Sequence, residues 1–120
     1  MKKPKIFIAC DTTSLTKVKK IIKQSQTTKI KIGYKFGLEF MNSKNGRQFI
    51  SKLKNKIIFV DLKLNDTVNT MLSAVKALGD LKINYLTVHI SSGLTALKAV
   101  KKVSKSTKII GVTTLTSLNN

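Results

Sequence analysis

Two carboxylates and a lysine lie close together in FVDLKLNDTVNT, residues 59–70. Asp61 and Lys63 end an apolar run, and Asp66 follows a short way beyond them. The chain has 23 Lys and Arg residues but only 5 Asp and Glu residues, so this local grouping is unusual. A lysine between carboxylates stays cationic, because each charge has an opposite neighbour. The spacing therefore predicts an ammonium group held ready to donate a proton, although a salt-bridge ladder at a strand end would have the same spacing.

The elements that must position these residues follow from the hydrophobic pattern. Apolar, β-branched runs predict five strands, at residues 5–10, 29–33, 56–62, 85–90 and 108–115. Between them, apolar residues recur at helical spacings, in residues 15–22, 49–53, 68–78 and 94–100. Alternating strands and helices predict right-handed βαβ units and a parallel sheet.

The near-continuous apolar strands suit a sheet buried on both faces, as in a doubly wound sheet or a (β/α)8 barrel. CDTTSLT, after the first run, lacks a Gly-rich phosphate fingerprint, which argues against a dinucleotide or P-loop fold. Polar residues instead follow or end the five runs: Asp11, Lys31, Asp61 with Lys63, His89, and Thr116 with Ser117. Barrel active sites form at the C-terminal ends of the strands.

A complete barrel needs about 200 residues or more. The 120 residues are therefore expected to be a single incomplete α/β domain, residues 1–120. It would hold the first five strands of a (β/α)8 TIM barrel and lack the later phosphate-binding loops.

Strand side chains alternate between faces, so Asp61 and Lys63 are expected to point the same way. Lys31, on the neighbouring predicted strand, is expected to approach Asp61 from the side. Asp66 is expected to reach across from the loop, which would complete an array of alternating charges.

The formal charge of +18 is compatible with a polyanionic partner or with a lysine-favouring composition. The lysines are spread along the whole chain, and Arg47 is the only arginine. Base readout and phosphate forks favour arginine, so nucleic-acid binding is the weaker interpretation. No apolar run approaches the roughly 20 residues of a membrane span. The single cysteine, Cys10, and the lack of an export signal predict a reducing cytoplasm.

DLKLNDTVNT resembles the DLKxxDxxxT signature of the orotidine 5′-phosphate decarboxylase family. IFIACD is similar to the family's first strand, KIKIGYKFG to its KxG second strand, YLTVHISSG to its VNVHxxGG strand and turn, and IIGVTTLTS to its fifth strand. These segments follow in the family's order over residues 5–118. Asn65 departs from the usual His or Ala, and Thr67 from the common Ile.

The resemblance implies that orotidine 5′-monophosphate is converted to uridine 5′-monophosphate and CO2 in pyrimidine biosynthesis, with no metal or organic cofactor. Lys63 would be the proton donor, and Asp61 would lie against the carboxylate that is lost. Lys31 and Asp11 would hold ribose hydroxyls and tie into the charged array.

The resemblance also implies a homodimer, in which Asp66 and Thr70 reach the neighbouring subunit's site. Thr116 would lie near the pyrimidine. Because the later phosphate-binding loops are not among these residues, the 120-residue chain alone is expected to be inactive or weakly active.

Other functions stay open at this point. Hexulose-phosphate synthases and ketogulonate-phosphate decarboxylases share DxKxxD but bind magnesium through a Glu on the second strand, where Lys31 is expected here. A lysine is a poor magnesium ligand, which disfavours them. A basic nucleic-acid-binding fragment and a non-catalytic remnant are the remaining alternatives.

Overall fold

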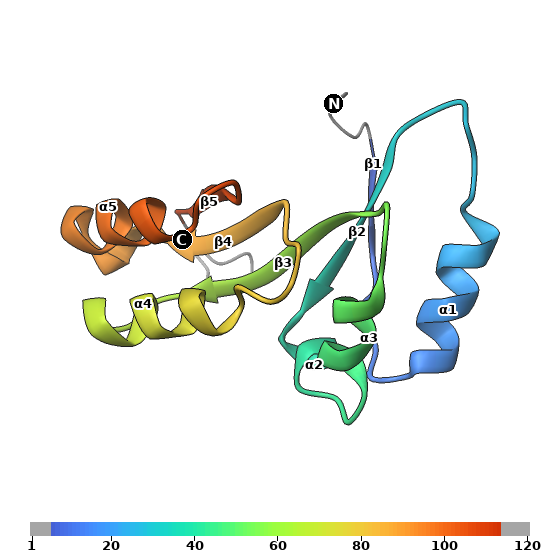
Figure 1. Cartoon of the computed structure of the whole chain (residues 1–120), viewed down its shortest axis with the longest axis horizontal. Coiled ribbons are helices and arrows are strands. Elements are labelled where there is room, and N and C mark those ends of the chain that lie inside the picture. Colours follow the sequence, from blue (N-terminus) through green and yellow to red (C-terminus); the bar gives the residue numbers. More distant parts are fainter. Residues whose placement is uncertain (1–5, 114–120) are drawn as a thin grey trace, which may run out of the picture.

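The computed structural model describes residues 6–113 and has alternating strands and helices (Figure 1). The elements are β1 (Ile6–Ala9), α1 (Leu15–Gln24), β2 (Ile32–Gly37), α2 (Leu38–Met41), α3 (Gly46–Lys52), β3 (Ile57–Leu64), α4 (Val68–Ala77), β4 (Tyr85–His89), the 3-10 turn η1 (Ile90–Ser92), α5 (Leu94–Val103) and β5 (Lys108–Val112). Within the described part, no helix has the length and apolar character needed to cross a membrane.

The strands form one parallel sheet in the order β1-β2-β3-β4-β5. Every strand thus pairs with the next one along the chain, and helices form the connections, as expected for successive βαβ units. This arrangement confirms the predicted fold class, the first five strands of a (β/α)8 barrel with flanking helices. The sheet is open in the described residues, because β1 and β5 each pair along one edge only.

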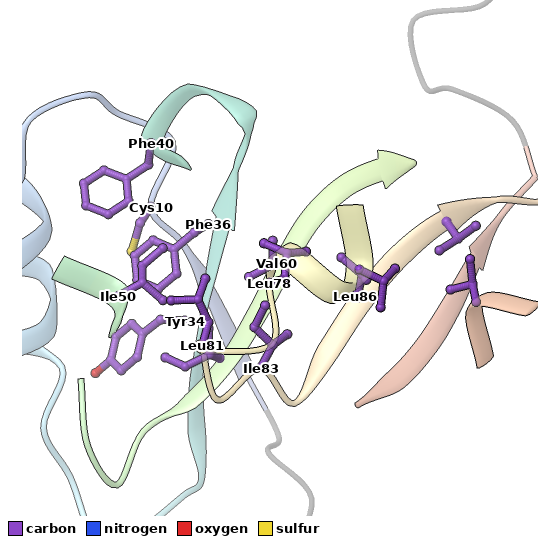
Figure 2. Packing of buried hydrophobic residues seen from close by; sticks show 14 of the residues in the cluster. Cys10, Tyr34, Phe36, Phe40, Ile50, Val60, Leu78, Leu81, Ile83 and Leu86 are labelled. Carbon is purple, nitrogen blue, oxygen red and sulfur yellow. The ribbon is translucent and has the colours of Figure 1, made fainter. Parts of the chain in front are cut away.

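One face of the sheet packs against the helices and forms the core (Figure 2). The strands contribute Tyr34, Phe36, Ile58, Val60, Leu86 and Val88, and Cys10 follows β1 directly. The helices contribute Val18, Phe40, Ile50, Met71, Val75, Ala96 and Val100. Burying a side chain of this size contributes about 1.5–3 kcal/mol. The helices are thus held to the sheet by apolar burial, which fixes the strand ends in space.

Helix α1 shows how the sequence sets this packing. Ser14 is the N-cap of α1, and its Oγ accepts a hydrogen bond from the Lys17 N–H at 3.2 Å. Val18 is fully buried, whereas the lysines of the helix face outward. The amphipathic pattern predicted for residues 15–22 is confirmed.

The other face of the sheet carries an aromatic cluster made of Phe7, Phe59 and Tyr85. The Phe7 ring centroid lies 5.2 Å from that of Phe59 and 5.4 Å from that of Tyr85. Gly33 leaves room for this cluster, since a Cβ there would stand 2.4 Å from the Phe7 ring. Phe7 remains 36% exposed, so this face is only partly covered in the described chain.

Strand β2 begins later than predicted. Residues 29–33 were expected to form it, but it runs over Ile32–Gly37. Tyr34 and Phe36, which are 2% and 0% exposed, lie on its helix-covered face, whereas Ile30 is 40% exposed and precedes the strand. Burial of the two large rings outweighs the β-branched pattern of the earlier residues. Lys31 therefore precedes the strand, and Lys35 lies near its C-terminal end.

Candidate active site

Asp61 is the centre of a charged cluster at the C-terminal end of the sheet. Its Oδ2 lies 2.9 Å from Lys63 Nζ and 3.4 Å from Lys35 Nζ, and its Oδ1 accepts a hydrogen bond from the Thr87 hydroxyl at 2.8 Å. The Asp61 side chain is only 12% exposed. One carboxylate is thus shared between two ammonium groups, and the predicted meeting of Asp61 and Lys63 is confirmed.

The electrostatics of the cluster favour an ionised carboxylate. Burial raises the pKa of Asp61, but hydrogen bonds from Lys63 and Thr87 and the charges of Lys63 and Lys35 outweigh it. The pKa of Asp61 is therefore lower than its ordinary value. At neutral pH the site holds a fixed negative charge beside an ammonium group.

A bulge at the end of β3 sets the position of Lys63. Val60 pairs with Leu86 and Leu64 pairs with Val88. Residues 61–63 of β3 therefore lie opposite a single β4 residue, Thr87. Lys63 adopts φ +49°, in the left-handed region that non-glycine residues avoid. Its N–H donates to the Thr87 Oγ1 at 2.9 Å. Strand alternation alone therefore does not explain why Lys63 and Asp61 meet, because the bulge re-aims Lys63.

The second lysine of the cluster is Lys35, and the prediction that Lys31 approaches Asp61 is wrong. Lys31 precedes β2 and lines a separate cavity together with Tyr34 and Asn55. The K-x-G pattern occurs twice in this stretch, as Lys31-Ile32-Gly33 and as Lys35-Phe36-Gly37. Gly37 pairs with Asp61, which places Lys35 beside the carboxylate.

The cluster opens into a cavity of about 590 Å³. Its lining comprises Asp11, Lys35, Gly37, Leu38, Glu39, Asp61, Leu62, Lys63, Asn65 and His89. Residues from four strands or the segments that follow them thus meet at one end of the sheet, as barrel sites require. Asp11 lies in this cavity as predicted.

A second cavity, of about 550 Å³, is lined by the C-terminal parts of α4 and α5 and the loops that follow them. Lys76, Lys82 and Lys105 line it, but no carboxylate does. It lacks the paired charges of the cluster, so we place the candidate site in the cavity beside Asp61.

Asp66 and Thr70 lie outside the cluster within this chain. Asp66 Oδ1 accepts the Thr67 N–H at 2.6 Å in the turn before α4, and the Thr67 hydroxyl donates to the Thr70 Oγ1 at 3.0 Å. Both side chains are exposed, and neither lines the cavity. The prediction that Asp66 joins the array is thus wrong for a single chain. Its predicted role toward a neighbouring subunit stays a prediction.

His89 lies at the rim of the cavity, and its orientation is fixed by its neighbours. Its Nδ1 accepts the Ser91 N–H at 3.2 Å and lies 2.6 Å from the Ser91 Oγ. Asn65 Nδ2 in turn donates to the Ser91 Oγ at 3.2 Å. Asn65, one of the two departures from the family pattern, therefore contacts the loop after β4.

Cys10 and Thr116 are also among the residues that the sequence analysis named. Cys10 is fully buried, and burial followed by the charge of Asp11 raises its pKa to about 11, so the thiol stays protonated at neutral pH. Thr116 lies outside the described residues. Among residues 6–113, no three His, Cys, Asp or Glu side chains gather into a group that could hold a metal ion.

Sequence reasoning missed Thr87 and Lys35. Thr87 is a polar residue at an inward position of β4 and is only 4% exposed. An isolated polar residue between Leu86 and Val88 is the available signal, because a buried hydroxyl needs hydrogen-bond partners. For Lys35, the signal is the second K-x-G.

Comparisons with known proteins identify the family of the chain. A model of the orotidine 5′-phosphate decarboxylase / HUMPS family matches residues 4–120. An orotidine 5′-phosphate decarboxylase of Malacoplasma penetrans is 38% identical over 98% of the chain. One from a Wolbachia of Brugia malayi is 39% identical over 96% of the chain.

Solved structures give the same result. The orotidine 5′-phosphate decarboxylase of Lactobacillus acidophilus superposes with a TM-score of 0.79 at 30% identity, over 98% of this chain and 56% of that one. The Methanocaldococcus jannaschii orotidine 5′-monophosphate decarboxylase, complexed with the inhibitor BMP, gives 0.76 at 28% identity, over 93% of this chain and 53% of that one.

The chain spans about half the length of the curated relatives that it matches, 52% for each of the two named here. The family match itself extends over nearly every residue of the chain, including the whole charged cluster. The chain belongs to the orotidine 5′-phosphate decarboxylase / HUMPS family.

Proposed function

We propose that this chain supplies the charged half of an orotidine 5′-phosphate decarboxylase active site. The reaction would convert orotidine 5′-monophosphate to uridine 5′-monophosphate and CO2, in pyrimidine biosynthesis. The observation that carries the proposal is the Asp61 carboxylate held between Lys35 and Lys63 in a cavity at the strand ends.

The chemistry of this reaction fits the cluster. Loss of CO2 leaves negative charge on a ring carbon, and a preorganised ammonium group beside that carbon stabilises the charge as it develops. In this proposal the Lys63 ammonium then donates a proton to the same carbon. Asp61 would lie against the substrate carboxylate and hold Lys63 in place through the 2.9 Å contact.

Substrate binding would use the other residues of the cavity. Lys35 takes the role first expected for Lys31, and with Asp11 it would hold the ribose hydroxyls. The orotidine 5′-monophosphate decarboxylase of Methanocaldococcus jannaschii has a structure with the inhibitor BMP, which supports a nucleotide as the substrate. We further propose a cytoplasmic homodimer in which Asp66 and Thr70 reach the partner's site.

The direct test uses a fusion of this chain with the second half of a relative. Its decarboxylation of orotidine 5′-monophosphate is monitored by the change in absorbance. A Lys63→Gln variant should lose activity by at least about 1,000-fold, since the proton donor and the charge stabiliser are one group. Unchanged turnover in that variant would contradict the proposed role of Lys63.

The magnesium-dependent relatives can be tested in the same assay. They carry a Glu on the second strand, and here the residue beside Asp61 on that strand is Lys35. Decarboxylation of orotidine 5′-monophosphate should persist in excess EDTA. Activity on a ketogulonate or hexulose phosphate that EDTA abolishes would favour the magnesium-dependent branch instead.

A further inference from the structure

Thr87 contacts both functional residues of β3 through one hydroxyl group. The hydroxyl donates to the Asp61 Oδ1 at 2.8 Å, and its oxygen accepts the Lys63 N–H at 2.9 Å. A hydroxyl has one proton to donate and two lone pairs that accept, so these two bonds are compatible and fix its orientation.

The bulge places this hydroxyl opposite the Lys63 backbone. Between the Val60–Leu86 and Leu64–Val88 pairs, Thr87 is the only β4 residue opposite the bulged β3 segment. The Lys63 N–H donates to the threonine side chain at this point. Because Thr87 is only 4% exposed, water has little access to replace its hydroxyl.

We propose that Thr87 is a positioning residue for decarboxylation, which holds the Asp61 carboxylate and the strained Lys63 backbone in one arrangement. This inference rests on the proposed function for its catalytic meaning, but the positioning itself is testable without turnover. Losing the hydroxyl would leave Asp61 without its neutral donor and free the Lys63 backbone at φ +49° to relax.

The first experiment measures the Asp61 carboxyl titration by carbon-13 NMR in the 120-residue chain, with Thr87→Val and Thr87→Ser. The hydrogen bond from Thr87 is one of the contacts that lower the pKa of Asp61. Thr87→Val should raise that pKa, and Thr87→Ser should restore the original value because it keeps the hydroxyl. An Asp61 titration that is unchanged in Thr87→Val would overturn the proposal.

Thr107→Val is the matched control. Its hydroxyl donates to the Ile83 carbonyl at 2.8 Å, at the opposite end of the sheet. The same chemical change there should cost stability without moving the Asp61 titration. An equal shift in Thr107→Val would show that the effect is merely structural and would contradict the proposal.

The second measurement does not depend on whether Thr87→Val folds. In the unsubstituted chain, the Lys63 amide should be protected from hydrogen exchange, and the Thr87 hydroxyl proton should exchange slowly enough to be observed. A Lys63 amide that exchanges at the rate of a free peptide would refute the contact itself. In a folded Thr87→Val chain, exchange at Lys63 should accelerate about 10-fold or more, as expected for a lost hydrogen bond.

Turnover of the completed enzyme separates this proposal from the proposed function. Thr87→Val should lower kcat about 10- to 100-fold with little change in KM, and Thr87→Ser should recover most of it. A completed enzyme that never decarboxylates would count against the proposed function alone, and the Asp61 titration would still decide the role of Thr87.

Discussion

Asp61 lies between two lysines, and the cavity that holds these three side chains is also lined by Asp11 and Glu39. The Asp61 carboxylate offsets the repulsion between the two ammonium groups, so both lysines can stay charged side by side. Both ammonium groups contact the same oxygen of Asp61, Oδ2, but at different distances. Lys63 lies closer to it than Lys35, at 2.9 Å against 3.4 Å.

The two lysines of the repeated K-x-G pattern give a matched pair of variants. Lys35→Gln removes a charge next to Asp61, whereas Lys31→Gln removes one before β2, in a different cavity. In the completed enzyme, Lys35→Gln should lower kcat/KM about 10- to 100-fold, the usual effect of losing a charged hydrogen bond. Lys31→Gln should stay within about twofold of the unsubstituted enzyme. Steady-state kinetics of both variants decide the assignment, and the reverse ranking would restore Lys31.

Acid should weaken the fold through Asp61. Its pKa is lower in the folded chain than in the unfolded chain, so its contribution to stability is fully present above the unfolded value of about 4. That contribution is lost as the pH falls through the folded pKa. The free energy of unfolding, measured in urea from pH 6 to pH 2, should therefore differ between the unsubstituted chain and Asp61→Asn. This difference should become smaller as the pH falls.

Asp80→Asn is the control for this measurement. Asp80 pairs with Arg47, and both side chains are exposed, so its effect on stability should be smaller at every pH. A constant difference between the chain and Asp61→Asn down to pH 2 would contradict the lowered pKa.

The sequence was sufficient to find Asp11, Asp61 and Lys63 and to place them at strand ends. It was insufficient to choose between two K-x-G triplets four residues apart. Lys31 has β-branched neighbours and Lys35 has aromatic ones, and strand propensity favours both kinds of residue. The choice depends on which register buries Tyr34 and Phe36, which is a property of the helices that pack over β2.

At the scale of elements, the bulge in β3 is the feature that could not be predicted from the sequence. DLKL reads as a regular strand end, and regular alternation already predicts that Asp61 and Lys63 share a face. The extra residues become apparent only from the pairing of β3 with β4. Bulges near functional sites re-aim side chains, and here the consequence is the contact between Lys63 and Thr87.

The conformation of the segment between β2 and β3, which contains α2 and α3, also depends on tertiary contacts. The four-residue helix α2 was not predicted, and it places Phe40 against Phe36 at a centroid distance of 5.2 Å. Gly46 is the first residue of α3 and lies against the backbone of α2. A Cβ at Gly46 would lie 1.8 Å from the Phe40 carbonyl oxygen, so α2 and α3 meet by backbone contact.

Gly46→Ala should therefore destabilise the chain markedly, by about 3 kcal/mol, because backbone rather than a flexible side chain stands in the way. Gly79→Ala is the comparison. Its Cβ would meet the Lys76 carbonyl oxygen at 3.0 Å, a tight contact that a small shift relieves, and it should cost less than about 1 kcal/mol. Thermal and urea unfolding of the two variants measure the difference, and equal stability would contradict the close approach of α2 and α3.

At the scale of the whole molecule, the described sheet has two free edges and one face that the helices do not cover. The edges of β1 and β5 are unpaired in the described residues, and Phe7, Phe59 and Tyr85 gather on the face opposite the helices. Exposed strand edges and apolar side chains favour association. In a closed barrel this inner face is filled by side chains from all the strands.

The isolated 120-residue chain should consequently show little or no decarboxylase activity, and a second polypeptide should restore it. The solved decarboxylase of Lactobacillus acidophilus is covered by this chain over 56% of its length, so its remaining residues define the complement to be co-expressed. Restored turnover should require Lys63, because the charged cluster lies entirely on this chain. Co-expression with Lys63→Gln is therefore the matched control. Family-typical turnover by the 120-residue chain alone would contradict the need for the later strands. Turnover by the mixture with Lys63→Gln would instead place the chemistry outside the Asp61 cluster.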